Sequence, residues 1–296
     1  MMHEGIQIRP ALPVLGEPAV QCSDATFGAL RSLIYSLTGI YFQDNKKYLL
    51  ESRIGKRLQV IGVESFEEYV RLLGSPSGRV EELRHLYNTI TINETFFFRN
   101  EPQFQAFEQT IVPALIAGRA TNGKSKIRVW SAASSSGEEA HTIGMIFHEK
   151  LRVKYPGLEI EIVGTDINQN VLDTASRGIY RDYSVRNMPR AYLEKYFTQK
   201  DDRYHLKDEI RRYSRFEFMN LYDRNRMRQM GAFDVIFCCN VLIYFDTKSK
   251  IQVVSDLYNA LSRGGHLFIG YAETLHGISS AFRLINFPKT VAYKKE

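Results

Sequence analysis

The chain of 296 residues carries a formal net charge of +6, with a hydrophobic fraction of 44% and a charged fraction of 24%, values typical of a globular, water-soluble protein. No apolar run reaches the roughly 18 residues that a membrane-spanning helix needs, and the N-terminus lacks the layout of a signal peptide. These features argue against membrane insertion and export. The basic balance favours an acidic partner without choosing among nucleic acid, membrane and protein.

Cysteine and histidine usage predicts a cytoplasmic protein without a metal site. The three cysteines include the adjacent pair Cys238 and Cys239, which cannot build a disulfide framework and indicate a reducing compartment. The pair falls in an expected strand, where neighbouring side chains face opposite sides, so joint metal ligation is not expected. The seven histidines show no spacing typical of metal ligands.

The N-terminal part of the chain is predicted to be helical. Residues 1–22, rich in proline and small residues, are expected to form a loose leader, and residues 23–92 a helical bundle domain. Apolar residues at three- and four-residue spacing predict the helices. Three side chains able to cap a helix mark expected starts: Asp24, Asp44 and Ser65. A turn at 75–78 leads to a fourth helix.

Strands and helices alternate after Arg99, which predicts a doubly wound, Rossmann-like α/β sheet covered on both faces. This domain is expected to span residues 93–296. Strands are predicted over 127–133, 159–166, 217–221, 233–239 and 265–271, with an antiparallel hairpin over 282–286 and 291–294. Residues 178–215 interrupt the alternation and are interpreted as an insertion. Basic residues outnumber acidic ones across residues 177–228, for which a solvated basic face is the alternative.

A strand, a turn of small residues and a helix start follow one another over 129–137, as in a nucleotide-type site. The turn is not G-x-G-x-x-G, so a dinucleotide is poorly supported. Asp166 closes the next strand, where a carboxylate can accept hydrogen bonds from both ribose hydroxyls of an adenosine. Capping of the following helix is its structural alternative. Glu138 and Glu139 begin the first helix, where the helix dipole favours carboxylates.

Four sequence blocks make the interpretation specific: Asn93–Arg99, Trp130–Ala133 with Gly137–Glu139, Thr165–Ile167 and Phe233–Asp246. Together they resemble the signature of the chemotaxis receptor methyltransferases, the CheR family, in the same order and at similar spacing, and the resemblance covers residues 24–296. It implies a helical domain followed by a methyltransferase domain with a small inserted antiparallel β-subdomain, which would account for residues 178–215.

The resemblance also implies an activity. The protein would be a protein-glutamate O-methyltransferase that uses S-adenosyl-L-methionine, releases S-adenosyl-L-homocysteine and forms methyl esters on methyl-accepting chemotaxis receptors. It implies cofactor contacts from nine residues: Asn93, Thr95, Arg99, Glu138, Asp166, Asn220, Leu221, Cys239 and Asn240. Glu138 is preferred to Glu139 by alignment alone. Arg99 suits a carboxylate of the cofactor or of the substrate, and stacking on the neighbouring phenylalanines is its alternative.

Methyl transfer to glutamate needs no general base, because a carboxyl group with a pKa of about 4.3 is already ionised at neutral pH. Catalysis is then expected from alignment and exclusion of water. Arg99 and Tyr244 are the predicted catalytic residues. The Tyr244 phenol can donate a hydrogen bond to the incoming carboxylate, and packing against Phe245 is its structural alternative.

The second predicted helix carries a basic face that could dock beside the acidic cytoplasmic helices of a receptor. Its predicted docking residues are Lys46, Arg53, Lys56 and Arg57. A solvated surface is the alternative. Some family members also grip a receptor's C-terminal pentapeptide through a glycine-containing loop, but residues 197–210 contain no glycine, so no tether is expected. Nothing in the sequence demands a dimer, and a monomer is expected.

Two other functions stay open. A nucleic-acid methyltransferase would suit the basic charge, but the chain lacks the Asn/Asp-Pro-Pro-Tyr/Phe segment that holds an extruded base and lacks an obvious RNA-binding module. A catalytically weak regulator that binds S-adenosylmethionine is the other, because Cys239 stands where the family usually has arginine. Ala140-His141 is a second departure, at the family's Pro-Tyr.

Overall fold

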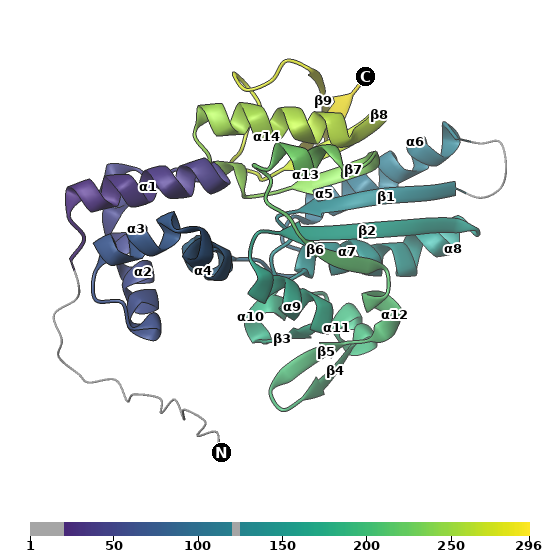
Figure 1. Ribbon diagram of the computed structural model, residues 1–296. Helices are drawn as coiled ribbons and strands as arrows, with labels where there is room; N and C mark the ends of the chain where they lie inside the picture. Colours follow the sequence, from purple (N-terminus) through teal and green to yellow (C-terminus); the bar gives the residue numbers. More distant parts are fainter. Residues whose placement is uncertain (1–20, 120–124) are drawn as a thin grey trace, which may run out of the picture.

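The computed structural model describes residues 21–119 and 125–296, in which a helical bundle lies beside a sheet with helices on both faces (Figure 1). The expected leader, residues 1–22, falls almost wholly outside the described residues. Within the described ranges, none of the helices combines the length and the apolar character required to cross a bilayer.

The helical bundle packs amphipathic helices around one apolar core. Its elements are α1 (Asp24–Thr38), the 3₁₀ turn η1 (Asp44–Lys46), α2 (Lys47–Ile61), α3 (Phe66–Gly74) and α4 (Pro76–Ile90). The core positions recur every three or four residues, as Leu50, Ile54 and Leu58 do in α2. The expected helical character of this region is therefore confirmed.

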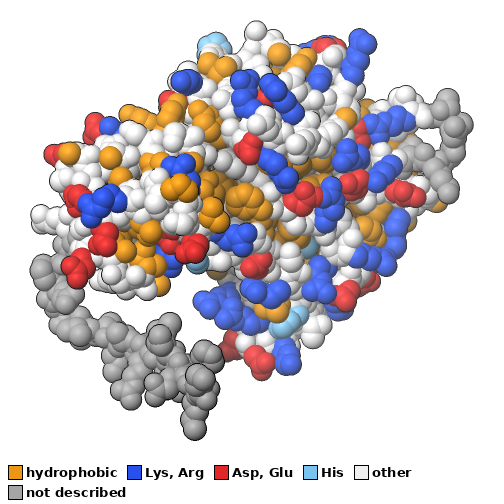
Figure 2. Space-filling model, viewed as in Figure 1, with side chains coloured by type: hydrophobic (Ala, Val, Ile, Leu, Met, Phe, Trp, Pro, Cys, Tyr) orange, Lys and Arg blue, Asp and Glu red, His pale blue; other side chains and the backbone are white. Residues whose placement is uncertain are grey.

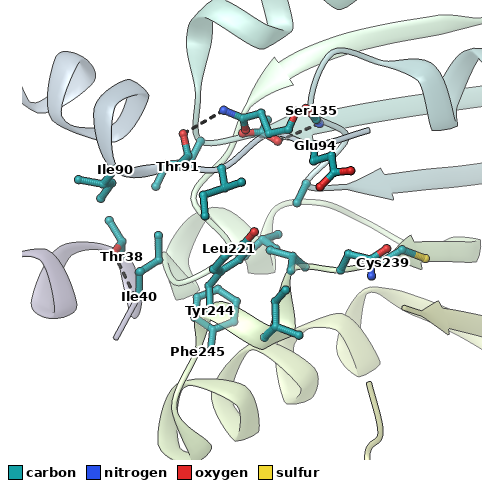
Figure 3. Close-up of a pocket in the computed structure, with 18 of the residues that line it drawn as sticks. Thr38, Ile40, Ile90, Thr91, Glu94, Ser135, Leu221, Cys239, Tyr244 and Phe245 are labelled. Carbon is teal, nitrogen blue, oxygen red and sulfur yellow. Dashed lines mark hydrogen bonds between the residues drawn. The ribbon is translucent and has the colours of Figure 1, made fainter. Parts of the chain in front are cut away.

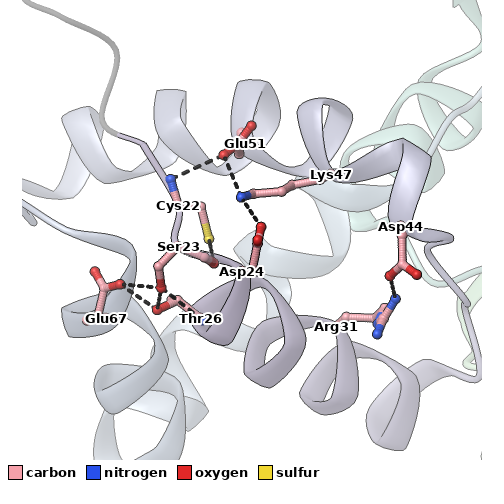
Figure 4. Close-up of polar contacts among 9 residues, drawn as sticks. All are labelled: Cys22, Ser23, Asp24, Thr26, Arg31, Asp44, Lys47, Glu51 and Glu67. Atoms are coloured by element: carbon pink, nitrogen blue, oxygen red, sulfur yellow. Dashed lines mark hydrogen bonds and ion pairs between the residues drawn. The ribbon is translucent and has the colours of Figure 1, made fainter.

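Polar contacts at the start of α1 correct one predicted cap (Figure 4). Ser23, not Asp24, caps the helix: its Oγ accepts a hydrogen bond of 3.1 Å from the N–H of Thr26. The Asp24 carboxylate instead lies 2.7 Å from Nζ of Lys47 in α2. Glu67 of α3 accepts hydrogen bonds from the Ser23 and Thr26 hydroxyls. These contacts fasten the first turn of α1 to two other helices.

The large sheet has the strand order β6-β2-β1-β7-β8-β10-β9. Its strands are β1 (Ser125–Ala132), β2 (Leu158–Asp166), β6 (Ser214–Phe218), β7 (Phe233–Cys238), β8 (Leu261–Ile269), β9 (Phe282–Phe287) and β10 (Thr290–Lys295). The first five of these run parallel, and the β9–β10 hairpin adds an antiparallel edge. The expected doubly wound sheet with a terminal hairpin is confirmed.

Side chains alternate between the two faces of the parallel strands and build a core on each. Trp130 and Ile236 belong to one core, whereas their neighbours Val129 and Phe237 belong to the other. The first core is covered by α13 (Arg224–Arg228) and α14 (Thr247–Ala260). The second is covered by α5 (Glu101–Ala106), the π-helical turn η2 (Phe107–Ile111), α6 (Val112–Ala117) and α7 (Glu138–Ile146).

Three elements differ most from the predictions. The helix predicted to start after the turn at residue 137 is divided into α7, the π-helical turn η3 (Phe147–Leu151) and α8 (Arg152–Lys154). Strand β6 begins and ends three residues before the predicted 217–221. It is an edge strand with partly exposed side chains, while the buried Met219 and Leu221 that suggested a strand lie just after it. Strand β8 begins four residues early, at Leu261.

The insertion forms a small subdomain with an antiparallel sheet of order β3-β5-β4 (Figure 1). Its elements, preceded by α9 (Gln169–Arg177), are β3 (Ile179–Tyr180), α10 (Asp182–Val185), α11 (Arg190–Tyr196), β4 (Phe197–Lys200), β5 (Arg203–Leu206) and α12 (Asp208–Arg211). Phe97 and Met145 enter its apolar core from the large domain. The expected small antiparallel sheet is confirmed.

Candidate functional site

A cavity of about 760 Å³ opens at the carboxyl ends of β1, β2 and β7, with the helical bundle as its opposite wall. Figure 3 shows Ser135 and Cys239 on the side of the sheet. Thr38 and Ile90 face them from the helical bundle. Strand order reverses between β1 and β7, the position where open α/β sheets bind ligands, and the volume suits a small-molecule site.

The turn after β1 brings the backbone close to this cavity. Ala133, Ser135 and Gly137 have φ angles of 60°, 50° and 89°. A Cβ on Gly137 would lie 2.7 Å from the Cβ of Ala175, so only glycine fits there. Ser134 lines the cavity, but its hydroxyl is buried from solvent and has no hydrogen-bond partner among the described residues.

Asp166 ends β2 at the floor of the cavity. Its Oδ2 accepts a hydrogen bond of 2.9 Å from the N–H of Ser135, and its Oδ1 accepts one of 2.9 Å from the N–H of Asn168. Burial raises the pKa of this carboxyl to about 6. Each oxygen keeps lone-pair capacity for one more donor, which is what two ribose hydroxyls require. Asn168, rather than Asp166, caps α9 through its own side chain.

Glu139, not Glu138, lines the cavity, which favours Glu139 as the cofactor ligand over the residue preferred by alignment. The Ser131 hydroxyl donates to Glu139 at 2.7 Å, and burial raises the pKa of Glu139 to about 7. Glu138 is 1% exposed and accepts a hydrogen bond of 2.8 Å from the Ser136 hydroxyl. Successive helix residues point about 100° apart, so only one of two adjacent glutamates can face the ligand.

The loop that precedes α5 supplies three predicted residues: Asn93, Thr95 and Arg99 all line the cavity. Arg99 is half-buried, and its Nη1 donates a hydrogen bond of 2.5 Å to the carbonyl oxygen of Glu94. Its guanidinium carbon lies 5.6 Å from the centre of the Phe96 ring. The stacking alternative and the carboxylate-binding role are therefore compatible for this side chain.

The inserted subdomain grips the same loop from outside. The guanidinium carbon of Arg186 lies 3.6 Å from the ring centres of both Phe96 and Tyr183. The Tyr183 hydroxyl donates a hydrogen bond of 2.6 Å to the carboxylate of Glu94, which lowers the pKa of that carboxyl. Stacking of Arg186 on Phe96 and the hydrogen bond from Tyr183 to Glu94 therefore tie the subdomain to the loop that carries Arg99.

Both predicted cofactor residues after β6 line the cavity, but the Asn220 side chain is also bonded to the helical bundle. Leu221 is buried against the cavity wall. Asn220 lines the cavity, yet its Nδ2 donates a hydrogen bond of 2.7 Å to the carbonyl oxygen of Leu37 in α1. Its Oδ1 accepts the N–H of Tyr222 at 3.0 Å. The Asn220 side chain thus joins the sheet to the helical bundle, a role that the sequence did not suggest.

Cys239 and Asn240 lie at the carboxyl end of β7 and line the cavity. The Cys239 thiol donates to Oε1 of Gln103 at 3.3 Å. Burial raises the pKa of Cys239 well above its ordinary value, so this position carries a neutral thiol. Asn240 adopts the left-handed backbone conformation, with φ of 61°.

Tyr244 lies at the end of η4 (Leu242–Tyr244), half-buried at the cavity. Burial raises the pKa of its phenol, while the charges of Arg53 and Arg99 act in the opposite direction. The phenol is therefore protonated at neutral pH and able to donate a hydrogen bond. The backbone carbonyl oxygen of Tyr244 accepts a hydrogen bond of 3.0 Å from the N–H of Tyr41, which joins Tyr244 to the helical bundle.

The four predicted docking residues have different environments. Lys46 and Arg53 line the cavity, and Lys56 is exposed on α2 away from it. Arg57 requires a correction: its guanidinium donates two hydrogen bonds, of 2.7 and 2.8 Å, to the buried carboxylate of Glu82. Because the side chains of Arg57 and Glu82 are only 17% and 6% exposed, this ion pair belongs to the interior of the bundle.

Among residues 21–119 and 125–296, no group of three or more His, Cys, Asp or Glu side chains is arranged to hold a metal ion.

Two family models match the chain: "CheR methyltransferase, all-alpha domain" over residues 25–91 and "CheR methyltransferase, SAM binding domain" over residues 93–291. The chain belongs to the CheR methyltransferase family. The Chemotaxis protein methyltransferase 2 of Vibrio cholerae is 36% identical over 92% of this chain and 93% of the relative. The Chemotaxis protein methyltransferase of Borreliella burgdorferi is 34% identical over 84% and 87%. The Chemotaxis protein methyltransferase 1 of Pseudomonas aeruginosa is 30% identical over 93% and 99%.

In this CheR-family chain the His141 departure lies in the core rather than in the cavity. The His141 ring is fully buried, and its Nε2 lies 3.0 Å from the carbonyl oxygen of Ala175. Burial lowers the pKa of His141 to about 4, so the ring is neutral. It packs edge-on against Phe216 and Tyr180. The substitution therefore changes helix packing and leaves the cavity lining intact.

Three residues that shape the site were not singled out from the sequence. Gln103 is buried, with its Nε2 donating at 2.6 Å to Ile269 and its Oε1 accepting the Cys239 thiol. Arg186 and Glu273 hold two loops of the cavity from outside. Only Gln103 offered a signal in the sequence, as a polar residue on the apolar side of an amphipathic helix. Arg186 and Glu273 act through contacts that are distant in the sequence.

Proposed function

We propose that this protein transfers a methyl group from S-adenosyl-L-methionine to glutamate side chains of methyl-accepting chemotaxis receptors, forming methyl esters for sensory adaptation. One observation carries the proposal: a single cavity joins a nucleotide-type floor, with Asp166 and Glu139, to Arg99, Tyr244 and the basic side of α2. Membership of the CheR methyltransferase family, including its SAM-binding domain, supports it. The division into residues 23–92 and 93–296 belongs to the same proposal.

The residues of the cavity fit this cofactor. Asp166 would accept the ribose hydroxyls, Glu139 would hold the cationic amino group, and Arg99 would bind the carboxylate of the methionine part. When bound, S-adenosyl-L-methionine supplies a methyl group on a positively charged sulfur, and S-adenosyl-L-homocysteine is the product. Asn93, Thr95, Leu221 and Asn240 would complete the wall.

The chain's own residues would align the acceptor, and none of them needs to act as a general base. A glutamate carboxylate is ionised at neutral pH, so it is already a nucleophile. Tyr244, whose raised pKa keeps its phenol protonated, would donate a hydrogen bond to one carboxylate oxygen and leave the other directed to the methyl group. The apolar walls formed by Ile40, Ile90 and Leu221 would exclude water from the aligned pair.

The acceptor helix would dock on the basic side of α2. Lys46 and Arg53 at the cavity and the exposed Lys56 are the proposed contacts, whereas Arg57 is bound by Glu82. Figure 2 shows that hydrophobic side chains gather between the helical bundle and the rest of the molecule on the face drawn. Cations around an apolar rim suit an amphipathic helix that carries glutamates.

The proposal includes a cytoplasmic monomer without a pentapeptide tether or nucleic-acid partner. Three unpaired cysteines, Cys22, Cys238 and Cys239, support a reducing compartment. The hairpin β4–β5 turns through Asp201 and Asp202, both with positive φ, rather than through glycine. Their carboxylates would repel the terminal carboxylate of a receptor's C-terminal peptide.

A catalytically weak regulator is the second candidate, and Cys239 is the observation that favours it. A neutral thiol stands where the family usually has an arginine, so the cavity has one cation fewer beside the cofactor. Tight cofactor binding without turnover on any receptor would support this candidate.

Labelled S-adenosyl-L-methionine and receptor-bearing membranes provide the test of the first candidate. Carboxyl methyl esters release volatile methanol on base treatment, whereas N-methyl products retain the label. We expect base-labile label on receptor and none on RNA. Label that resists base, or label transferred to RNA alone, would contradict the proposed function.

A further inference from the structure

The carboxylate of Glu273 lies outside the cavity and accepts hydrogen bonds from three backbone N–H groups. Its Oε2 accepts hydrogen bonds from Gly270 at 2.6 Å and from Asn240 at 2.9 Å. Its Oε1 accepts a third from Ile243 at 3.2 Å. Hydrogen bonds to an ionised carboxylate are stronger than those between neutral groups. One side chain therefore joins the turn after β8 to the segment after β7.

That segment is the 239–244 loop, which forms one wall of the cavity. Five of its six residues line the cavity: Cys239, Asn240, Val241, Ile243 and Tyr244. The loop has little regular structure of its own beyond the single turn η4. Asn240 adopts the left-handed conformation, with a φ of 61°, which asparagine tolerates better than most residues. With so little regular structure, the shape of the loop depends on support from outside.

Gly270 makes this support sterically possible. A Cβ at Gly270 would lie 2.7 Å from Oε2 of Glu273 and 2.8 Å from the backbone nitrogen of Asn240. The N–H of Glu273 also donates to the carbonyl oxygen of Gly270 at 2.9 Å, which closes a tight turn directly after β8. The carboxylate is thus held by its own turn while it binds the loop.

We propose that Glu273 is a positioning residue, which holds the 239–244 loop so that the Tyr244 phenol meets the acceptor carboxylate; this role rests on the proposed function. Glutamine at position 273 would keep the volume but offer a single acceptor oxygen, and its NH₂ group would face a backbone donor. Glu273→Gln therefore removes at least one of the three bonds without creating a cavity.

Steady-state kinetics on receptor membranes test the role. Glu273→Gln should lower kcat about tenfold or more, as expected when aligned groups are misplaced. The Kd for S-adenosyl-L-homocysteine should rise by a smaller factor than kcat falls, because the loop contributes Asn240 to the cofactor wall whereas Asp166, Glu139 and Arg99 lie on other elements. In a Tyr244→Phe background the same substitution should have little further effect, since residues that act as a unit are not additive. Glu159→Gln, an exposed charge loss on β2, is the matched control.

Hydrogen exchange gives a reading that does not depend on activity. Faster exchange in Glu273→Gln, confined to residues 239–244 and 270–273, supports the role, whereas faster exchange throughout β7 overturns it because the protein is then destabilised as a whole. An unchanged kcat, or independent effects of the substitutions at 273 and 244, also overturns it. A wild-type protein without base-labile methyl transfer would instead contradict the proposed function, and this role with it.

Discussion

Two carboxyl groups at the cavity floor have lost much of their contact with water, which raises the pKa of Glu139 to about 7 and that of Asp166 to about 6. Glu139 is therefore partly protonated at neutral pH. A cationic amino group beside it would favour the ionised form and lower its pKa. Binding would then expel the proton.

We expect cofactor binding to release a proton from Glu139 near pH 7. Affinity should rise as the pH increases through about 7 and level off above it, where Glu139 is already ionised. Calorimetry with S-adenosyl-L-homocysteine in buffers of different ionisation enthalpy measures this release. Glu139→Gln should abolish it and weaken binding about tenfold, the loss expected for a charge-assisted hydrogen bond.

Glu138→Gln is the matched control for that experiment. It makes the same substitution at the neighbouring residue, whose side chain does not line the cavity. Proton release should persist in this variant. Release that disappears in Glu138→Gln but not in Glu139→Gln would mean that the alignment was right about the ligand residue.

At the scale of elements, α2 carries basic residues with different roles: Arg57 stabilises the bundle, whereas Lys56 is a proposed receptor contact. Arg57→Ala would leave the buried Glu82 carboxylate without its ion-pair partner, and we expect the free energy of unfolding to fall by about 3 kcal/mol in urea denaturation. Lys56→Glu, one residue away and exposed, should leave it within about 0.5 kcal/mol. This charge reversal should instead raise KM for receptor. Equal stability of the two variants would contradict the assignment of the internal ion pair.

Periodicity predicted those elements that are buried on a regular pattern, such as the bundle helices and the central strands β1, β2 and β7. It misplaced β6, because an edge strand with exposed polar side chains lacks the pattern. Site residues at strand ends could be located, because parallel strands end at one edge. The partner of Arg57 could not be predicted, since Glu82 lies 25 residues away on another helix.

At the scale of the whole molecule, the helical bundle is bonded to the same loops that form the cavity. Asn220 donates to Leu37, and Tyr41 donates to Tyr244, so both sides of the cavity mouth have a bond to the bundle. Ile40 also forms an isolated antiparallel bridge with Phe245. The position of the bundle is therefore coupled to the position of the Tyr244 phenol.

Substitutions at two glycines with similar φ angles can distinguish this coupling from the effect of local backbone strain. Gly39 and Gly62 end α1 and α2 with φ of 71° and 69°. Alanine costs either position about 1 kcal/mol of backbone strain. A Cβ at Gly39 would also lie 2.6 Å from the Tyr222 ring, whereas a Cβ at Gly62 meets nothing within 4 Å.

We expect Gly39→Ala to displace Tyr222 and the adjoining bundle, and so to lower kcat/KM for receptor severalfold beyond any effect of strain. Gly62→Ala should lower the Tm while leaving receptor kinetics unchanged, because its added methyl group points into open space. Thermal unfolding and initial rates on receptor membranes measure both. If the two variants lose the same activity at the same cost in Tm, then strain alone explains the loss, and contact between the bundle and the sheet does not set the geometry of the acceptor site.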